Sequence, residues 1–312
     1  MKCFQIPKQG GTFELVERPI PKPGEGQILI KLLACGICKG DTSIKDNIFP
    51  GVKYPIILGH EIIGEIAELG PNIKNLKKND IVGLGIPAGY MFDGGFAQYM
   101  LAKESDVVTI PQGLVPVESA PLLCAGVTTF SALKNSGAKE GDLVVICGIG
   151  GLGHLAVQYS NKLGFKTVAI SRTEGKKDLS LKIGAKYYFS TEKDDLVKEI
   201  TALGGAKAVI VTGPSENISD KLIECLQEGG KLMLVGTNTK KMEFSINPII
   251  FGKKSIQGWI CFDNEVKKEC LEFSLKNGVK PMVEVYKFED LPKGYESMAS
   301  GKARFRNVIK FE

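Results

Sequence analysis

The sequence predicts an α/β protein with a doubly wound parallel sheet and a separate β-rich domain. Residues 1–122 contain short apolar or alternating runs separated by Pro and Gly turns, a pattern typical of a barrel or sandwich. From Gly141 onward, strand-like and helix-like runs alternate, which is typical of a parallel sheet with helices on both faces. The turn GIGGLG, at residues 148–153, follows the first strand of this alternation. A chain of 312 residues is long enough for about two domains.

The composition excludes several classes of protein. With 43% hydrophobic and 24% charged residues, the chain has an ordinary globular composition. The net charge of +5 is dispersed without a basic block, so we expect no nucleic-acid partner. No apolar run approaches the ~18 residues of a membrane span, and Met1–Gly10 lacks the apolar segment of a signal peptide, so we expect no membrane partner. The eight cysteines are scattered through mostly apolar segments, which predicts free thiols and a cytoplasmic location.

The first part of the chain is expected to be almost entirely strands and turns. Few segments before residue 115 have helical periodicity, and turn sequences such as PKPGEG and DGG separate the apolar runs. The strands expected here are Gln27–Leu33, Pro55–Leu58, Glu65–Leu69, Ile81–Leu84, Phe96–Leu101 and Val107–Ile110.

The pattern changes near Pro116, after which residues 117–137 predict a helix. Alternating strands and helices follow, and the tail of the chain returns to a mixed pattern. We therefore expect one domain made of residues 1–122 and 260–312, and a second made of residues 123–259. The strands expected in the second domain are Leu143–Cys147, Thr167–Ser171, Lys186–Ser190, Ala208–Thr212, Lys231–Gly236 and Lys254–Trp259. The helices between them are Leu152–Leu163, Lys176–Ile183, Asp194–Leu203 and Ser219–Gln227.

The GIGGLG turn predicts a dinucleotide site. Gly148 permits the tight turn, Gly150 lets the backbone approach a pyrophosphate, and Gly153 lets the helix pack closely on the strand. The helix N-terminus adds free N–H groups and the positive end of a dipole. The motif alone is weak, and a glycine-rich turn without a ligand is the alternative, but here it opens a βαβ unit, which is the Rossmann context. The expected cofactor-binding residues are Gly148, Gly150, Gly151, Leu152 and Gly153.

The end of the next strand predicts which dinucleotide binds. A site for NAD places Asp or Glu there to accept a hydrogen bond from the ribose 2′-hydroxyl. This chain instead has Ser171, Arg172 and Thr173, followed by Lys176, and such cationic and hydroxyl groups bind a 2′-phosphate. We therefore expect NADP(H) to be favoured over NAD(H). The alternative is a solvated basic loop in which Glu174 supplies the missing carboxylate.

His60 lies between Gly59 and Glu61, directly after a short apolar run. An imidazole fixed on a rigid element suits a metal ligand, and a core histidine bonded to a backbone carbonyl is the alternative. Cys35 and Cys38 form a CxxC, which can be a redox pair, half of a zinc site or two core thiols. The pair follows a β-rich run instead of opening a helix in a βαβ unit, which disfavours the redox pair. A four-cysteine structural site would need a second CxxC, and the sequence has none.

Five motifs together identify a resemblance. They are CGICKGD (35–41), GHEIIGEIAELGPNI (59–73), DGGFAQYM (93–100), APLLCAGVTTFSAL (120–133) and GIGGLGHLAVQYSNKLG (148–164). With them the chain resembles the medium-chain, zinc-dependent alcohol dehydrogenases, especially the cinnamyl-alcohol-dehydrogenase-like branch, over nearly its whole length. The resemblance implies a GroES-like catalytic domain beside the Rossmann domain. It also implies hydride transfer between NADP(H) and a primary alcohol or aldehyde, with zinc as the Lewis acid on the substrate oxygen.

The resemblance also implies roles for particular residues. The catalytic zinc ligands would be Cys38, His60 and Cys124. Glu61 would lie just outside these ligands or exchange with bound water, and Asp41 would orient the imidazole. Family members pair the edge strands of their Rossmann domains, which implies a homodimer. Further cofactor contacts would come from Lys39, Thr128 and Arg306.

The chain departs from the family pattern in two places. Family members carry Ser or Thr where this chain has Gly40, and that hydroxyl passes the alcohol proton towards solvent, so the usual relay is absent; Thr42 and Ser43 are its nearest hydroxyls in sequence. The four-cysteine loop that binds a structural zinc is also missing, because residues 82–89 run almost directly into residues 90–95. We therefore expect one zinc per chain. The apolar wall of the substrate cleft, or else ordinary core, would be Ile48, Phe49, Ile86 and Phe92.

Two other functions remain open at this point. Gly40 favours an NADPH-dependent reductase of another activated C=O, C=N or C=C bond in which zinc is not catalytic. The missing loop would also be consistent with a nucleotide-binding scaffold that has lost catalysis. Retention of Cys38, His60, Cys124 and Asp41 argues against the scaffold, because a redundant site need not keep its ligands.

Overall fold

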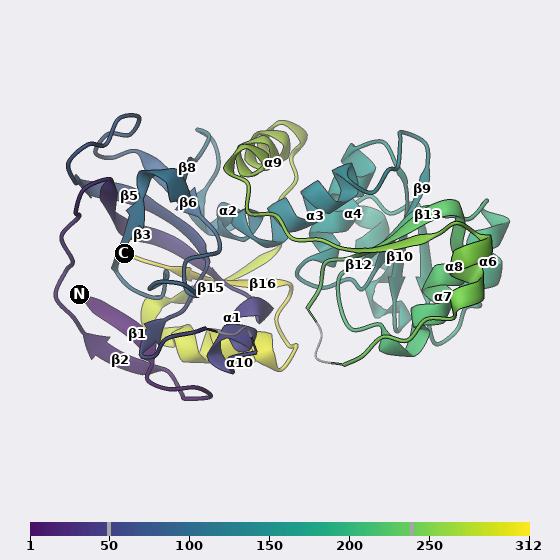
Figure 1. Cartoon of the computed structure of the whole chain (residues 1–312), viewed down its shortest axis with the longest axis horizontal. Coiled ribbons are helices and arrows are strands. Elements are labelled where there is room, and N and C mark those ends of the chain that lie inside the picture. Colours follow the sequence, from purple (N-terminus) through teal and green to yellow (C-terminus); the bar gives the residue numbers. More distant parts are fainter. Residues whose placement is uncertain (49–50, 238–239) are drawn as a thin grey trace. The chain divides into compact units, whose positions relative to one another are not determined.

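The computed structural model describes residues 1–48, 51–237 and 240–312, and its elements are labelled in Figure 1. The chain divides into two compact units. Unit 1 comprises Met1–Cys124 and Phe262–Glu312, and unit 2 comprises Ala125–Cys261. Within the described ranges, no helix combines the length and apolar character that crossing a membrane requires.

Unit 2 is built on a six-stranded parallel sheet with the order β11-β10-β9-β12-β13-β14. The strands β10 and β11, which follow β9 in sequence, lie on one side of it, and the chain then crosses back to place β12 on the other side of β9. A ligand site is expected at this reversal, at the carboxyl ends of the strands. The strands are β9 (Leu143–Cys147), β10 (Lys166–Ser171), β11 (Tyr187–Ser190), β12 (Ala206–Val211), β13 (Leu226–Leu234) and β14 (Ser255–Gly258).

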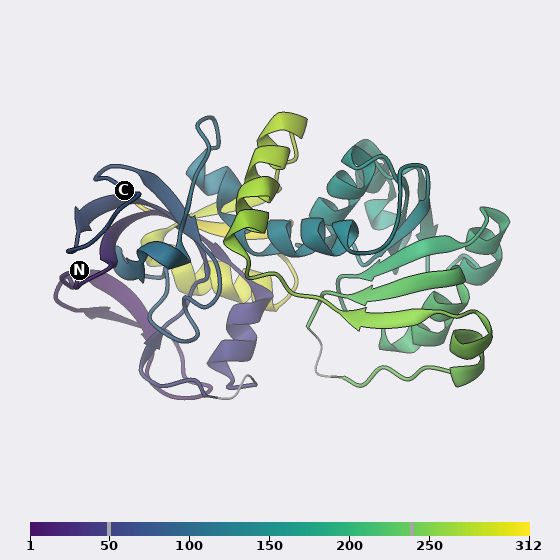
Figure 2. The same cartoon turned by 45° about the horizontal axis from the view of Figure 1, so that its top comes forward.

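Helices cover both faces of this sheet, as Figures 1 and 2 show. Every residue of β9 is buried, which explains why its sequence, LVVIC, is apolar throughout instead of alternating. The prediction of a doubly wound α/β sheet is confirmed. The helices of unit 2 are α3 (Ala125–Lys134), α4 (Gly153–Lys162), α5 (Lys177–Lys182), α6 (Leu196–Ala202), α7 (Ser219–Glu224) and α8 (Ile246–Phe251).

Unit 1 is β-rich, as predicted. Its larger sheet has seven strands in the order β15-β16-β3-β5-β6-β8, with β7 also paired to β3, and a smaller sheet has the order β2-β1-β4. The C-terminal strand β16 (Arg306–Lys310) pairs antiparallel with β3 (Gln27–Ile37), so the end of the chain completes a sheet begun near its start. The remaining strands are β1 (Lys2–Ile6), β2 (Glu14–Glu17), β4 (Ile56–Ile57), β5 (Glu61–Leu69), β6 (Ile81–Leu84), β7 (Tyr99–Lys103), β8 (Val108–Thr109) and β15 (Val283–Lys287).

One helical prediction is wrong. The segment 117–137 is not one helix, because α2 (Pro116–Ser119), the short 3₁₀ helix η2 (Ala120–Leu123) and α3 follow one another with a break at Cys124. Cys124 has φ −128° and ψ −74°, which no helix continues through. The other helices of unit 1 are α1 (Lys39–Lys45), α9 (Asn264–Asn277) and α10 (Leu291–Ala299).

Helix α1 was not expected from the sequence, because it begins at a cysteine. Its N-cap is Cys38, whose sulfur accepts a hydrogen bond from the backbone N–H of Gly40, while the Asp41 carboxylate accepts from the N–H of Cys38. This is the reciprocal arrangement of a capping box, with cysteine in the place that Ser or Thr usually takes. The start of α1 could therefore have been predicted from Asp41, the acidic residue three positions after Cys38.

The longest pairing in unit 1 joins β3 to β5, and Gly64 is the residue that lets them approach. A β-carbon at Gly64 would lie 2.4 Å from Ile30 Cγ2 and 2.5 Å from the Lys31 carbonyl oxygen. The two strands are therefore closer at this point than any side chain permits.

Gly64→Ala is expected to lower the free energy of unfolding by about 1–3 kcal/mol, because the added methyl forces β3 and β5 apart. Gly213→Ala is the matched control, since a β-carbon at Gly213, shortly after β12, would meet no atom within 4 Å. The measurement is urea unfolding of both variants. Equal midpoints for the two would contradict the close approach.

Candidate functional site

The pairing of β3 with β5 brings two expected metal ligands together. In this antiparallel pair Gly36 lies opposite Glu61, so the end of β3 lies beside the start of β5. Cys38 follows β3 directly and His60 precedes β5 directly. Cys124 reaches the same place from the end of η2, where the backbone leaves the helical conformation. From the sequence, β5 was predicted to begin at Glu65, four residues later than it does. The observed start at Glu61 places that residue opposite Gly36.

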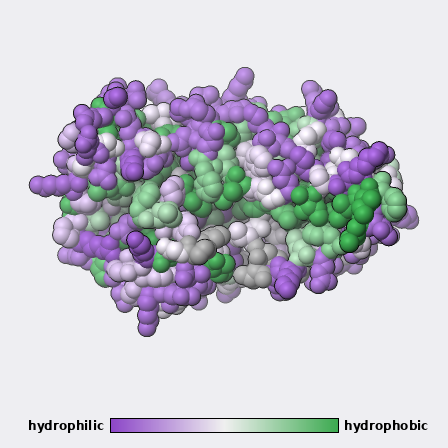
Figure 3. Space-filling view, in the orientation of Figure 1, coloured by the Kyte–Doolittle hydropathy of each residue, from purple (hydrophilic) through white to green (hydrophobic). Residues whose placement is uncertain are grey.

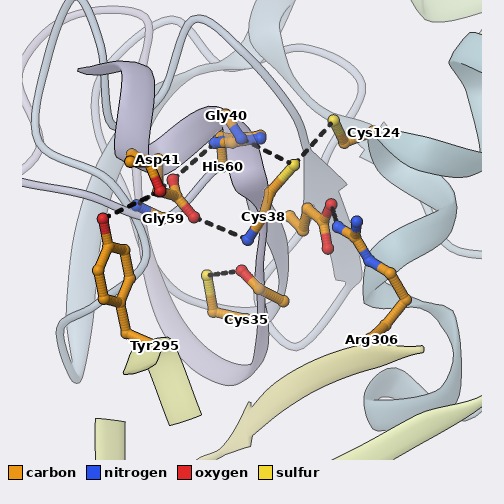
Figure 4. A network of polar contacts seen from close by, with 12 residues as sticks. Cys35, Cys38, Gly40, Asp41, Gly59, His60, Cys124, Tyr295 and Arg306 are labelled. Atoms are coloured by element: carbon orange, nitrogen blue, oxygen red, sulfur yellow. Dashed lines mark hydrogen bonds and ion pairs between the residues drawn. The ribbon is translucent and has the colours of Figure 1, made fainter. Parts of the chain in front are cut away.

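Cys38, His60, Glu61 and Cys124 form a compact donor group. One ligand atom from each lies within 4.8 Å of the others, and the two sulfurs are 4.0 Å apart. Among the residues that the structure describes, this is the one group of three or more such side chains close enough to share an ion. Cys38, His60 and Glu61 are buried, and Figure 4 shows Cys38, His60 and Cys124 gathered around one point.

The fully buried carboxylate of Asp41 holds the imidazole of His60. Its Oδ1 lies 2.8 Å from His60 Nδ1, its Oδ2 accepts from the Cys38 N–H at 2.9 Å, and the Gly59 N–H donates to Oδ1 at 3.3 Å (Figure 4). The other ring nitrogen, His60 Nε2, is buried without a hydrogen-bond partner among the described residues. A histidine with one ring nitrogen hydrogen-bonded to a carboxylate, and with no partner for the other nitrogen, has the arrangement typical of a metal ligand.

The ionisation of this group follows from its contacts. Burial by itself lowers the pKa of His60, but the negative charges of Asp41 and Cys38 outweigh it and raise the pKa to about 10. The hydrogen bond from the Cys124 thiol is the main reason that the pKa of Cys38 is well below its ordinary value. The same bond, together with burial, raises the pKa of Cys124. Without a cation the group therefore keeps protons that a bound metal would displace.

Glu61 and Arg306 form a buried ion pair next to the donors. Arg306 Nη2 donates to Glu61 Oε1, and the two side chains are 4% and 0% exposed. Glu61 Oε2 and Arg306 Nε have no partner among the described residues. A β-carbon at Gly36 would lie 1.9 Å from Glu61 Oε2, so residue 36 has to be glycine for Glu61 to take this position. The expected contact of Arg306 with cofactor phosphates stays a prediction.

The donor group fits a zinc ion. Two sulfurs and one imidazole, with a carboxylate nearby, are the ligand types that zinc takes in proteins. The bare Nε2 of His60 and the bare Oε2 of Glu61 are buried polar atoms, and such atoms cost free energy unless something pairs with them. A cation bound by the sulfurs would satisfy His60 Nε2.

The expected nucleotide turn joins β9 to α4. Gly148 has φ +92°, and a β-carbon at Gly153 would lie 1.8 Å from the Gly148 carbonyl oxygen, so both positions require glycine. A β-carbon at Gly150 would meet nothing within 4 Å. This open space above the turn, at the N-terminus of a ten-residue helix, fits the approach of a dinucleotide pyrophosphate. Gly151 and Leu152 complete the turn, and the Leu152 carbonyl accepts the first hydrogen bonds of α4.

The residues expected at the ribose lie directly after β10. Ser171 is the last residue of that strand, and Arg172 follows with an exposed side chain. The Thr173 hydroxyl accepts from the Gly175 N–H at 3.4 Å. Lys176 donates to the Ile149 carbonyl, so its ammonium lies at the glycine turn.

Glu174, the alternative source of a ribose-binding carboxylate, lies on the same exposed loop. It is paired with Lys193 and, at 3.6 Å, with Lys177. Its charge is therefore already matched by lysines within unit 2.

The other expected positions are less informative. Lys39 is the exposed first residue of α1, and Thr128 is buried in α3. Ile48 is half exposed, whereas Phe92 packs against the core of unit 1, and Phe49 lies outside the described residues.

Two contacts that support the site come from the C-terminal part of the chain and were not predicted from the sequence. Tyr295 of α10 donates a hydrogen bond to the Thr42 hydroxyl at 3.1 Å. The Arg306 pairing with Glu61 was also missed. These partners are separated by 253 and 245 residues, so no local pattern could have revealed them.

Comparison with known proteins agrees with this geometry. Residues 24–112 match the family model of the alcohol dehydrogenase GroES-like domain, and residues 151–276 match that of the zinc-binding dehydrogenases. An alcohol dehydrogenase of Geobacillus stearothermophilus is 33% identical over 100% of this chain and 99% of its own length. A probable cinnamyl alcohol dehydrogenase 6 of Arabidopsis thaliana is 31% identical over 92% of this chain and 88% of its own.

Solved structures include a similar one, described as CAD from Helicobacter pylori complexed with NADP(H). It is 26% identical to this chain, covers 99% of it and 97% of its own length, and has a TM-score of 0.86. The two family models and the full-length relatives confirm the resemblance that the sequence motifs indicated. The chain belongs to the medium-chain alcohol dehydrogenase family and is an oxidoreductase of the alcohol dehydrogenase and cinnamyl alcohol dehydrogenase type.

Proposed function

We propose that this chain is a zinc-dependent oxidoreductase that transfers a hydride between NADP(H) and a primary alcohol or aldehyde. The observation that carries the proposal is the meeting of Cys38, His60 and Cys124 around the bare Nε2 of His60. A zinc ion held there supplies Lewis acidity to the oxygen of an alcohol or aldehyde, and the nicotinamide supplies or accepts the hydride.

Residues of the chain hold the donor group in place before a metal or substrate binds. Asp41 fixes the ring of His60 and, through the Cys38 N–H, the start of α1. The Gly40 N–H donates to the Cys38 sulfur at 3.4 Å, which stabilises the thiolate. Arg306 pairs with one oxygen of Glu61 and leaves the other without a hydrogen-bond partner among the described residues. Such supports lower the reorganisation that substrate binding would otherwise require.

One ion per chain is proposed. The group around Cys38 is the one ligand cluster in the described residues, and the other cysteines are single thiols, most of them buried. The turn after β6 is short, with Ala88 and Phe92 bridged to each other, where relatives by resemblance carry the structural-zinc loop.

The preference for NADP(H) rests on the loop after β10. Arg172 is exposed there, and the nearby carboxylate of Glu174 is paired with lysines. A guanidinium beside a ribose site binds a 2′-phosphate, which a free carboxylate would repel. The similar protein from Helicobacter pylori, which was solved with NADP(H), is a further support.

A homodimer is proposed through unit 2. β14 lies at the end of the sheet order, so one of its edges is open to pairing. Just before it in the chain, α8 exposes three large apolar side chains, Ile246 at 68%, Ile250 at 60% and Phe251 at 81%. Figure 3 shows an apolar area over α8, and apolar areas of this kind are typical of protein–protein contacts.

The first test is removal of the metal. The purified protein is expected to contain about one zinc per chain, and stripping it with a chelator should reduce aldehyde reduction by at least about a hundredfold, because the electrophilic cation is lost. Added zinc should restore the rate. Elemental analysis and NADPH oxidation measure both. Cys124→Ala should behave like the stripped protein, whereas Cys3→Ala, a buried cysteine of the same unit, should not. Activity that survives stripping would favour a reductase with non-catalytic zinc.

The second test concerns the coenzyme. Arg172→Ala is expected to lower kcat/KM for NADPH by about 10- to 100-fold, because a charge-assisted contact is worth about 1.5–3 kcal/mol. The value for NADH should stay within about twofold, since NADH lacks the phosphate. Lys166→Ala removes an exposed charge at the opposite end of β10 and should change neither value. A wild-type chain that uses both coenzymes equally would contradict the preference.

The third test concerns assembly. Phe251→Asp is expected to convert a dimer into a monomer, because it places a charge in the apolar area. Sedimentation equilibrium of the wild type and the variant measures the change. Leu181→Asp alters an exposed leucine on α5, 41% exposed, and should leave the dimer intact. A wild-type monomer at micromolar concentration would rule out this interface.

A further inference from the structure

The glycine turn between β9 and α4 has two chemically different sides. A trans peptide group is planar, so its C=O and the N–H of the next residue point in opposite directions. A group that binds the carbonyl oxygens of Gly148, Ile149 and Gly150 therefore also sets the direction of the N–H groups of residues 149, 150 and 151. In this chain a side chain binds each of these three carbonyl oxygens.

Thr212, directly after β12, holds the first of the three carbonyls. Its hydroxyl lies 2.5 Å from the Gly148 oxygen and 3.1 Å from the Cys147 oxygen. Carbonyl oxygens only accept, so the hydroxyl is the donor. The Thr212 N–H also donates to the Cys147 oxygen, at 2.9 Å, next to the pairing of β12 with β9. The hydroxyl is therefore carried by a backbone that is itself fixed against the turn.

His154 and Lys176 hold the next two carbonyls. His154 Nδ1 lies 2.9 Å from the Gly150 oxygen, so the ring carries its proton on this nitrogen. Burial lowers the pKa of His154 to about 4, and the ring is neutral near pH 7. Lys176, from the segment after β10, donates to the Ile149 oxygen. The three donors thus come from three separate parts of unit 2.

The opposite side of the turn is a row of free N–H groups. Within the part of the chain that the structure describes, the backbone N–H groups of residues 149–152 donate to no other atom. A β-carbon on Gly150 would meet nothing within 4 Å, so the space beside the turn is open. Successive free N–H groups next to open space, at the N-terminus of a helix, are suited to a phosphate group.

We infer that Thr212, Lys176 and His154 are positioning residues for the coenzyme, which hold the carbonyl side of the turn and so present its N–H groups to the pyrophosphate. The inference rests on the proposed coenzyme site and extends it. It gives Lys176 a role different from the contact with a 2′-phosphate that was expected from the sequence. Without these donors the peptide groups could rotate, and coenzyme binding would have to order them first.

The first test removes the hydroxyl of Thr212 without changing the shape of the side chain. Thr212→Val is expected to raise the Kd for NADPH, NADH and ADP-ribose alike by about 3- to 10-fold, as the loss of one hydrogen bond does. Thr212→Ser keeps the donor and should stay within about twofold of the wild type. His154→Phe replaces a buried ring by one without the N–H donor and should resemble Thr212→Val. Isothermal titration calorimetry measures each Kd without turnover.

The second test separates the turn from the ribose site. Adenosine 2′-monophosphate carries the 2′-phosphate of NADPH but no pyrophosphate. Lys176→Met is expected to raise the Kd for NADPH, NADH and ADP-ribose by about 10-fold, because its hydrogen bond has a charged donor, and to leave that for adenosine 2′-monophosphate unchanged. Arg172→Ala should show the reverse pattern, with weaker binding of NADPH and adenosine 2′-monophosphate only.

Thr167→Val is the matched control for Thr212→Val. Thr167 lies in the same sheet at the start of β10, is 1% exposed, and donates to the Ser160 hydroxyl at 2.8 Å. Its loss should lower the midpoint of urea unfolding about as much as the loss of the Thr212 hydroxyl, but it should change no Kd. A merely structural role of Thr212 would make the two variants alike in both measurements.

Three results would overturn the inference or its basis. Wild-type Kd values in Thr212→Val and Lys176→Met would show that the turn needs no side-chain donors. Weaker binding of NADPH and adenosine 2′-monophosphate by Lys176→Met, with NADH unchanged, would return Lys176 to the 2′-phosphate. A wild-type chain that binds neither coenzyme nor ADP-ribose would overturn the proposed function itself, and the first two results differ from this one because the wild type still binds.

Discussion

The structure of unit 1 depends on one buried carboxylate. Asp41 accepts hydrogen bonds from the backbone of Cys38 and Gly59 and contacts the ring of His60. Burial of a carboxylate costs several kcal/mol unless hydrogen bonds replace its water, and here three donors do so. The same group caps α1, fixes the loop before β5 and sets which nitrogen of His60 is bare. Asp41 therefore stabilises the start of α1 and the orientation of the His60 ring at the same time.

Several glycines lie where a neighbouring group leaves no space for a β-carbon. Gly36 makes space for the Glu61 carboxylate, and Gly153 makes space for the Gly148 carbonyl. In each case the neighbour is backbone or a buried, tethered group, which cannot retreat as a surface side chain would. Gly150 differs from them because its missing β-carbon leaves open space, which fits a ligand instead of a packing contact.

Several features of the site were predictable from local patterns. The strand Leu143–Cys147 was predicted with the bounds that the structure has, since a fully buried parallel strand is uniformly apolar. The glycine turn and its helix followed from spacing alone. Helix α1 was missed because cysteine is not an expected N-cap, and the helix predicted across Cys124 was wrong because helical periodicity does not reveal a single residue with a different backbone conformation.

The sequence by itself determined the fold class, the family and the set of chemically capable residues, because periodicity, glycine spacing and ligand types are written in short stretches. Only the tertiary structure decided which of these residues meet. The contacts of Arg306 with Glu61 and of Tyr295 with Thr42 join segments more than 240 residues apart, through β16 pairing with β3 and α10 packing beside α1. Such contacts are set by strand register and side-chain volume, which no local pattern of residues encodes.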